Sequence, residues 1–343
     1  MSLDPVQLTR SLVDIESITY NEGAVGTFLA EFLGRRKFAV EKMPVEQHKE
    51  SRSTSERFNV YASVPGGDAE VVFSTHMDTV PPFMPSSEDE EFLYGRGCCD
   101  AKGIIVAQIA AAERLREEGT GVGLLFVVGE ERDSAGAKTA NQQPRGSRFL
   151  INGEPTDNRV ALASKGALRA VIRASGKMAH SAYPELGESA TLKLVEALHR
   201  IAAIPLPVLE NVGPSTLNIG TLSGGHAPNV IADHAEAQVM VRLVGDSAET
   251  RRAIEEAVEG LATVEFTLEI PFQRFRAPDG LTTMVAAFTT DVPFLGNWGE
   301  PLLLGPGSIH VAHTPHEQLA KKELFEAIDL YAEVARRLVT APR

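Results

Sequence analysis

Histidine and acidic residues follow several apolar runs of this 343-residue sequence. In FSTHMDTVPP, at residues 73–82, His76 and Asp78 come directly after the apolar run VVF. Similar side chains stand at or near the ends of other such runs, at Asp100, Glu130, Glu131, Glu154 and His313. Each one alone is most simply a solvated loop residue. Together they offer two imidazoles and several carboxylates, a mixture that suits divalent metals such as zinc or cobalt.

These donors can be divided between two metal sites that share one carboxylate. His76, Asp100 and Glu154 would hold one ion. Asp100, Glu131 and His313 would hold the other, so that Asp100 bridges the two. In two-metal hydrolytic sites the ions lie about 3.5–4 Å apart. The residue types therefore predict a metal-dependent hydrolase.

Two acidic residues beside these ligands would complete the chemistry. Asp78 would accept the second ring proton of His76 and so fix the orientation of that imidazole. Only one of the paired glutamates need be a ligand, so Glu130 would act as the general base that takes a proton from water. Glu317, four residues beyond His313, would either orient that histidine or cap the last helix.

The segments that must position these residues alternate between helix and strand. Helical apolar spacing covers 5–17 and 23–36, the Ala-rich stretch 101–119 is the clearest helix, and a long helix covers 318–340. Strand-like runs lie at 38–40, 58–64, 71–75, 123–128 and 149–152. This pattern predicts an α/β catalytic domain with a mixed, largely parallel sheet flanked by helices. Ligands bind such a sheet at the carboxyl ends of its strands, where the donors stand.

A different pattern begins near residue 163. A strand at 167–175 is followed by a helix near 188–203, two strands at 216–225 and 235–244, a helix at 247–262 with Ser247 as its N-cap, and a strand at 264–270. This is the split βαβ arrangement of ferredoxin-like α+β domains. We therefore expect a catalytic domain formed by 1–162 and 274–343, with a lid domain, 163–273, inserted into it.

Composition narrows the class of protein and its partners. The net charge of −13 argues against a nucleic-acid or anionic-membrane partner. No apolar run is long enough to span a membrane, and the N-terminus lacks the basic and apolar segments of a signal peptide. The only cysteines, Cys98 and Cys99, are adjacent and form no disulfide framework. These features predict a cytoplasmic location.

Several motifs resemble those of the M20 metallopeptidase and amidohydrolase family: HMDTVP, GRGCCDAKG, GEE, NGEPTD, AHSA and AHTPHE. The segment GPGSIHVAHTPHE looks most like the acetylornithine and acetyl-lysine deacetylase branch. The resemblance implies a zinc-exopeptidase-like fold and two divalent ions, Zn²⁺ or Co²⁺, held by the ligand set given above. It also implies Asp78 as the partner of a ligand, Glu130 as the base and a cis peptide bond after Asp100.

The same resemblance implies roles for the inserted domain as a lid and a dimerisation domain. In a homodimer, His180 would reach the active site of the partner and stabilise the oxyanion. Asn229 and Arg242 match positions that bind the substrate carboxylate in relatives. His226 lies in the same loop as Asn229. Unless it contacts the substrate, we expect it to be structural or solvated.

The predicted activity is removal of an N-acyl group, in particular acetyl, from a small amino acid such as N2-acetylornithine, acetylcitrulline or acetyl-lysine, as in arginine biosynthesis. The alternatives are an M20-type dipeptidase or exopeptidase and a deacylase like succinyl-diaminopimelate desuccinylase. A binding protein on a disused hydrolase scaffold is disfavoured because all the proposed ligands and Glu130 are present. The sequence contains neither GxSxG nor HExxH, which excludes serine hydrolases of the nucleophile-elbow type and zincins.

Overall fold

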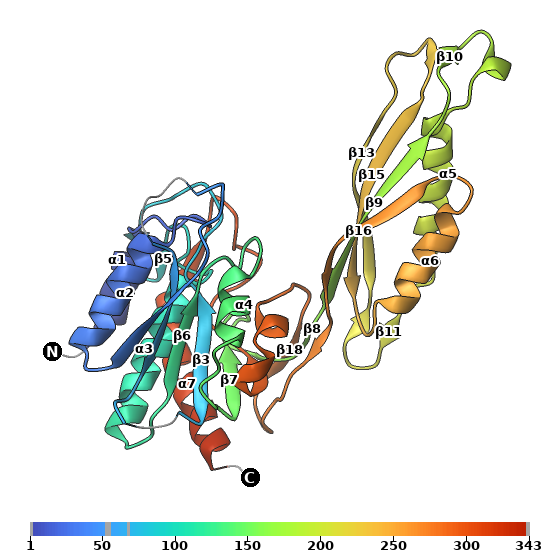
Figure 1. The fold of residues 1–343 in the computed structure, drawn as a ribbon. Coiled ribbons are helices and arrows are strands. Elements are labelled where there is room, and N and C mark those ends of the chain that lie inside the picture. The colour runs from blue at the N-terminus through green and yellow to red at the C-terminus, as the bar shows by residue number, and fades with distance from the viewer. Residues whose placement is uncertain (1–2, 52–55, 67–68, 341–343) are drawn as a thin grey trace. The chain divides into compact units, whose positions relative to one another are not determined.

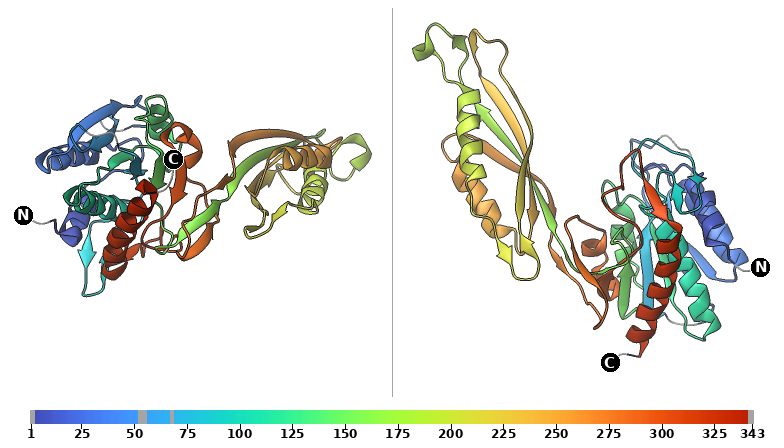
Figure 2. Two further views of the ribbon diagram at one scale, coloured as in Figure 1. Left: turned by 90° about the horizontal axis from the view of Figure 1, so that it is seen from below. Right: turned by 180° about the vertical axis from the view of Figure 1, so that it is seen from behind.

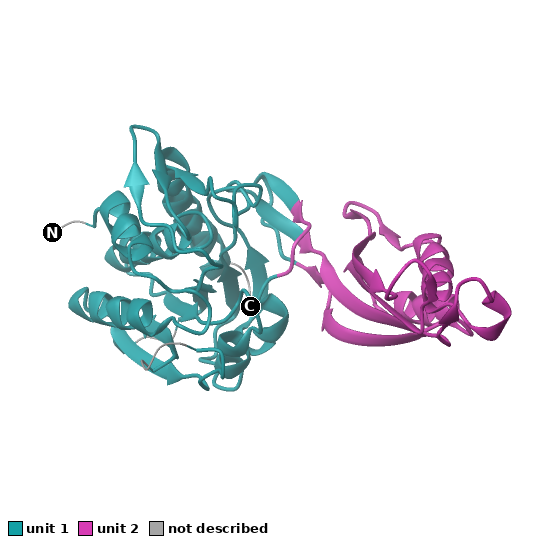
Figure 3. Ribbon diagram, turned by 90° about the horizontal axis from the view of Figure 1, so that it is seen from above, with its two compact units in different colours: residues 1–162, 275–284, 290–343 teal, residues 163–274, 285–289 magenta. Residues whose placement is uncertain are grey.

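The polypeptide forms two units in the computed structural model, which describes residues 3–51, 56–66 and 69–340. Unit 1 consists of Met1–Leu162, Phe275–Met284 and Thr290–Arg343, and unit 2 of Ala163–Arg274 and Val285–Thr289 (Figure 3). Sequence analysis assigned 285–289 to the catalytic domain, whereas the structure groups this short segment with unit 2.

A six-stranded sheet runs through the described part of unit 1, in the order β1-β2-β6-β3-β7-β19 (Figure 1). The pairs β6/β3, β3/β7 and β7/β19 are parallel, and β1/β2 and β2/β6 are antiparallel. The predicted mixed, largely parallel sheet is therefore confirmed. Its strands are β1 (Ala39–Pro44), β2 (Phe58–Ser63), β3 (Val71–His76), β6 (Gly123–Val127), β7 (Phe149–Asn152) and β19 (Glu300–Leu303).

The central strands β3, β6 and β7 are buried on both faces, and each begins with an apolar run. Val71 and Phe73 belong to a core shared with the long helices, whereas Val72 belongs to a second core that contains Trp298. Figure 2 shows the helices and strands from two further directions. The helices of unit 1 are α1 (Pro5–Val13), α2 (Gly23–Arg35), α3 (Lys102–Glu117), α4 (Ala135–Asn141) and α7 (Lys321–Val339). No helix in the described residues is long and apolar enough to cross a membrane.

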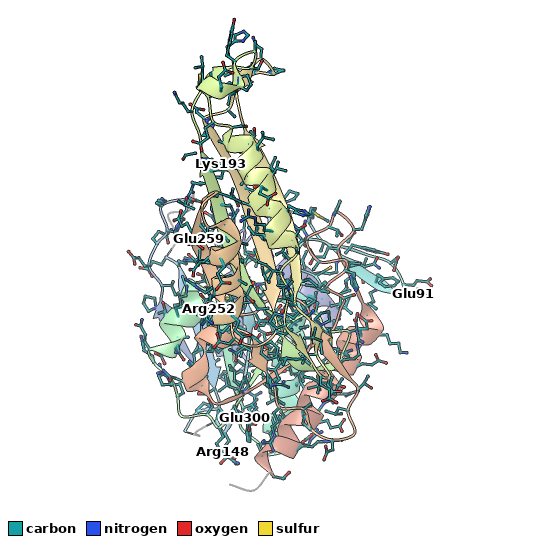
Figure 4. All side chains as sticks on the ribbon, turned by 90° about the vertical axis from the view of Figure 1, so that its right-hand side faces the viewer. Glu91, Arg148, Lys193, Arg252, Glu259 and Glu300 are labelled. Carbon is teal, nitrogen blue, oxygen red and sulfur yellow. The ribbon has the colours of Figure 1, made fainter. Side chains whose placement is uncertain are left out.

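Unit 2 contains a four-stranded antiparallel sheet in the order β13-β15-β9-β16. Its elements follow each other as β9 (Gly166–Ser175), α5 (Ala190–Ala202), β13 (Thr216–Gly224), β15 (His234–Leu243), α6 (Ala248–Val258) and β16 (Thr263–Ile270). This order is ferredoxin-like, as predicted. Both helices contribute to one hydrophobic core on one face of the sheet. Their other faces carry charged side chains such as Lys193 and Arg252 (Figure 4).

The start of α6 differs in one detail from the prediction. Ser247 occupies the N-cap position, but its hydroxyl makes no capping hydrogen bond and donates to Glu269 instead. Asp246 accepts a hydrogen bond from the main-chain nitrogen of Ala248 at 2.7 Å. A carboxylate one residue earlier therefore takes the place of the predicted serine cap.

Short elements complete the chain. Two three-stranded sheets have the orders β20-β5-β4 and β17-β8-β18, and two-stranded pairs are formed by β10 with β14 and β11 with β12. The strands are β4 (Ser87–Glu88), β5 (Phe92–Tyr94), β8 (Val160–Ser164), β10 (Ala179–His180), β11 (Val208–Leu209), β12 (Gly213–Pro214), β14 (Val230–Ile231), β17 (Gln273–Arg274), β18 (Thr283–Ala286) and β20 (Gln318–Ala320). Single 3₁₀ turns are η1 (Pro184–Leu186), η2 (Val292–Phe294) and η3 (Gly296–Trp298).

Candidate active site

Two groups of metal-binding side chains lie in unit 1, where β3, β6 and β7 end. His76, Asp100 and Glu154 each offer one ligand atom, and these atoms all lie within 4.8 Å of one another. Asp100, Glu131 and His313 form a second group by the same measure. The structure thus brings the five proposed ligands together in the two predicted sets, with Asp100 in both.

The geometry of Asp100 suits a bridging ligand. Its Oδ1 lies 2.9 Å from His76 Nε2, and its Oδ2 lies 3.3 Å from His313 Nε2. The second imidazole also lies 2.9 Å from Glu131 Oε1. Each carboxylate oxygen of Asp100 therefore faces a different histidine. The peptide bond between Asp100 and Ala101 is cis, as the family resemblance implied.

The donor set fits a pair of divalent cations. Glu154 is buried, and its Oε1 has no hydrogen-bond partner in the part of the chain that the structure describes. An unpaired buried carboxylate oxygen is costly, and a cation between Glu154, His76 and Asp100 would satisfy it. Three carboxylates and two imidazoles are also a ligand set that zinc and cobalt accept.

The electrostatics of the site point the same way. Burial, and then the charge of Glu154, raises the pKa of Glu130 well above its ordinary value. Burial likewise raises the pKa of Glu154. Hydrogen bonds to Asp100 and then to Glu131 raise the pKa of His313 to about 10. Crowded acidic groups that are buried together in this way favour positive charge among them.

The Asp78 carboxylate makes contacts that the sequence analysis did not predict. The Nδ1 atom of His76 lies 3.0 Å from the main-chain oxygen of Asp78, whereas the Asp78 carboxylate is 3.6 Å away. That carboxylate instead accepts the main-chain N–H groups of Gly129, Glu130 and Glu131, at 2.9, 3.1 and 3.2 Å. At 3.6 Å the Asp78 carboxylate lies just beyond hydrogen-bond distance of the ring, although it still helps to raise the pKa of His76, so its predicted role as the partner of His76 stays a prediction. A main-chain carbonyl holds the ring, and the side chain fixes the turn that carries the proposed base and a ligand.

The turn after β6 needs both Asp78 and a glycine. Gly129 has φ +82°, and a Cβ on it would lie 2.3 Å from Nη2 of the buried Arg57. The main-chain oxygen of Gly129 accepts the N–H groups of Asp133 and Ser134 at 3.0 and 2.7 Å. This tight turn brings Glu130 close enough to Glu154 and His76 for their charges to act on it.

Glu317 has neither of the roles considered from the sequence. Its Oε1 accepts the main-chain N–H groups of Gly97, Cys99 and Asp100 at 2.8, 3.3 and 3.2 Å. Its Oε2 lies 2.5 Å from Nη1 of the buried Arg96. The carboxylate therefore holds the loop that presents Asp100. The position of Glu317 after His313 drew attention to it, but no sequence signal connects it with RGCCD.

Asp291 was not singled out from the sequence. It precedes η2 and is 1% exposed, and neither carboxylate oxygen has a regular hydrogen bond in the described residues. Burial raises its pKa to about 7, although the Ser134 hydroxyl is close enough to oppose the shift. Its charge acts on Glu130 and Glu154, so it belongs to the surroundings of the site. A lone Asp in TTDVP gives no signal of this burial.

The three remaining predicted residues lie in unit 2. His180 and Asn229 are close together, because β10 pairs with β14 and the main-chain N–H of Ser181 donates to the oxygen of Asn229 at 3.0 Å. Arg242 lies near the C-terminal end of β15, and His234 is the first residue of that strand. At about 3.4 Å per residue, the two are roughly 27 Å apart along the strand. Within one chain the structure brings His180 and Asn229 together, but not Arg242.

The choice of His313 over its neighbours gives a direct prediction. His310 and His316 belong to neither group of donors around Asp100 in the described residues. His313→Ala should therefore lose one of two bound metal ions, because it removes a ligand, whereas His310→Ala should keep both. Elemental analysis of the dialysed proteins would measure this. If only the His310 variant lost metal, His310 rather than His313 would be the ligand.

Comparison with known proteins identifies the family. The model of peptidase family M20/M25/M40 matches residues 72–337. The chain belongs to this family. A peptidase M20 domain-containing protein of Schizosaccharomyces pombe is 38% identical over 95% of this chain and 82% of its own length. A probable carboxypeptidase of Aspergillus terreus is 38% identical over 97% of this chain and 85% of its own length.

Solved structures of an aminopeptidase and of a metallo-carboxypeptidase show the same fold. Aminopeptidase PepT of Bacillus cereus superimposes with a TM-score of 0.79 at 21% identity, and 98% of each chain is covered. The M20 family metallo-carboxypeptidase Sso-CP2 of Sulfolobus solfataricus gives 0.75 at 14% identity, with 98% of this chain and 99% of that one covered. At these identities the likeness concerns the fold alone.

The family membership corrects one preference of the sequence analysis. This chain is an M20 metallohydrolase that acts on amide bonds. The two relatives described above are named as an M20 domain protein and a probable carboxypeptidase, and neither is named as a deacetylase or as an enzyme of arginine biosynthesis. The exopeptidase alternative is therefore better supported than the deacetylase branch.

Proposed function

We propose that this chain is a two-metal carboxypeptidase that hydrolyses the amide bond before the C-terminal residue of a short peptide. The arrangement that carries the proposal is the pair of donor groups joined by Asp100, with Glu130 beside them. The similarity to a probable carboxypeptidase over 97% of the chain supports the choice of substrate. Zn²⁺ is the proposed resident ion, and Co²⁺ the alternative.

The residues of the chain divide the work. When bound, two divalent cations would supply Lewis acidity that activates a water molecule and polarises the amide carbonyl. Glu130 accepts the proton of the attacking water and passes it to the leaving amine. Asp78 keeps Glu130 and Glu131 in place through their main-chain N–H groups, and Glu317 does the same for Asp100.

A deacetylase remains the second candidate because GPGSIHVAHTPHE resembles that branch. The two reactions break the same kind of bond. An N-acetyl amino acid is a small N-acylated compound with a free C-terminal carboxylate, so the candidates differ in the size of the acyl side. The difference lies in the pocket rather than in the catalytic groups.

A panel of matched amides tests the proposal. The zinc-loaded enzyme would be given an N-blocked dipeptide with a free carboxylate, the same dipeptide with a free amine and an amidated C-terminus, and the acetyl and succinyl derivatives of single amino acids. A carboxypeptidase should cleave the first with the highest kcat/KM. Preference for the amidated dipeptide would indicate an aminopeptidase. Preference for acetylornithine or acetyl-lysine would favour the deacetylase function over the carboxypeptidase function.

We also propose that the protein forms a homodimer through unit 2. β13 is an edge strand of its sheet, and Leu222 on it is 60% exposed. Leu192 and Val195 on α5 are 71% and 56% exposed. An exposed sheet edge beside apolar side chains is a surface that a second copy would cover. If Asn229 and Arg242 both bind one small substrate, their separation within unit 2 requires that they come from different copies.

His180 gives the test of action across the dimer. His180→Ala should lower kcat and leave the metal content unchanged, because the side chain is exposed in unit 2 and belongs to neither donor group around Asp100. Mixing it with Glu130→Ala chains should restore about a quarter of wild-type activity, since half of randomly exchanged dimers are mixed and each has one complete site. Absence of recovery after demonstrated subunit exchange would show that His180 acts within its own chain.

A further inference from the structure

A third group of metal-binding side chains lies in unit 2. His226 Nε2 is 2.9 Å from Asp233 Oδ1, and His234 Nδ1 is 3.0 Å from the same oxygen. The centroids of the two imidazole rings are 5.1 Å apart. The ligand atoms of the three residues all lie within 4.8 Å of one another. The M20 chemistry described above uses none of these residues.

The spacing of these donors matches that of the catalytic centre. There, His76 and Asp100 approach to 2.9 Å, and His313 and Glu131 to 2.9 Å. Zinc with ligands at about 2.0–2.1 Å needs donor atoms roughly 3.3 Å apart, so a small outward shift of each side chain suffices in both places. The unit 2 group has the same separation of donors and the same chemistry of imidazole with carboxylate.

The backbone holds the three side chains near each other. The loop from Gly225 to Asp233 joins β13 to β15, with a short β14 within it, and β13 and β15 pair up to Gly224 and Ala235. At its ends, the N–H of Gly225 donates to the oxygen of His234 at 3.2 Å, and that of Gly176 to the oxygen of Asp233 at 2.7 Å. A metal would therefore meet ligands that are already gathered.

The site is open to solvent, in contrast to the buried His76 and Asp100. The side chains of His226, Asp233 and His234 are 44%, 38% and 64% exposed. An ion can reach them directly, and water can fill the remaining coordination positions. Without a metal ion, both imidazoles can donate hydrogen bonds to the same oxygen of Asp233, which keeps the three side chains together.

We propose that His226, Asp233 and His234 form a third metal site, for a first-row transition cation such as Zn²⁺ or Cu²⁺. Two imidazoles and one carboxylate favour these ions over Mg²⁺ or Ca²⁺, which prefer all-oxygen ligands. The site is independent of the proposed carboxypeptidase activity. A bound ion would tie the two ends of the loop that carries Asn229, next to the β10 strand that carries His180.

Zinc stoichiometry tests this site. Wild-type enzyme with its catalytic ions in place would be equilibrated against micromolar Zn²⁺ and analysed for zinc per chain, beside His226→Ala, His234→Ala and the control His199→Ala. His199 is an exposed histidine of α5 outside the group. Wild type and control should hold about three zinc ions, and each ligand variant about two. A site with three protein ligands loses its ion when one of them is removed.

A spectroscopic readout separates this site from the catalytic one. Half an equivalent of Cu²⁺ added to protein that holds only its two catalytic zinc ions should give an electron paramagnetic resonance signal with coupling to two nitrogens, absent in both ligand variants. Circular dichroism would confirm that the variants are folded. Wild type with only two zinc ions would overturn the proposal. So would a third ion that persists in both ligand variants, or one that is lost equally in His199→Ala.

Discussion

Glu130→Gln should keep both zinc ions of the catalytic centre, as the wild type does, and turn over its best substrate roughly 10²–10⁴-fold more slowly. Glu130 belongs to neither donor group, so its replacement removes no ligand. The amide of Gln has almost the same shape as the carboxylate but cannot accept the proton of the attacking water. The main-chain N–H of residue 130 still donates to Asp78, so the turn is retained. Elemental analysis and steady-state kinetics on the same preparation measure both quantities.

The neighbouring glutamate provides the matched control. Glu131→Gln changes the same functional group one residue away, in a turn held by the same Asp78 carboxylate. Because Glu131 is a donor of the second group, this variant should lose an ion as well as activity. A Glu130→Gln enzyme with near-normal kcat would exclude Glu130 as the base. Loss of metal by that variant would make Glu130 a ligand.

The sequence predicts best the positions of residues that directly follow a strand, because the neighbouring strands determine which other residues lie beside them. VVF and GLLFVV are apolar throughout because both faces of the sheet are covered, and this pattern can be read without coordinates. Once these strands are parallel neighbours, the side chains after them meet at one edge. His76, Glu131 and Glu154 could therefore be grouped from the sequence, although they are far apart in it.

The roles that sequence analysis missed depend on main-chain contacts across the fold. Asp78 stands two residues from His76, so the sequence favoured a side-chain contact between them. Its carboxylate accepts hydrogen bonds from three main-chain N–H groups of the turn after another strand, which the sequence did not predict. Asp291 precedes η2, which packs against α4, and its side chain is buried. No local sequence pattern predicts this burial. The sequence could not decide between deacetylase and carboxypeptidase for a related reason: the two reactions use the same catalytic groups, and the motifs report those groups rather than the pocket.

Glu317→Ala should weaken metal binding about 10–100-fold and lower the free energy of unfolding by about 3–5 kcal/mol. The side chain is buried and accepts three main-chain N–H groups of the Asp100 loop. Without it, that loop loses the contact that fixes the bridging ligand, and Arg96 is left as a buried charge without its partner. Metal titration and urea denaturation of the metal-free protein measure the two effects separately.

The two functions of Glu317 can be separated by variants that keep one of them. Glu317→Gln retains an oxygen that can accept the loop N–H groups but removes the charge that pairs with Arg96, so it should lose stability while binding metal better than Glu317→Ala. Adding Arg96→Met removes the unpaired guanidinium and should recover part of that stability. If Glu317→Ala bound zinc as tightly as the wild type, the Asp100 loop would hold its own shape. If the double variant were less stable than Glu317→Gln, the stability lost in Glu317→Gln would arise from the Asp100 loop and not from the unpaired charge of Arg96.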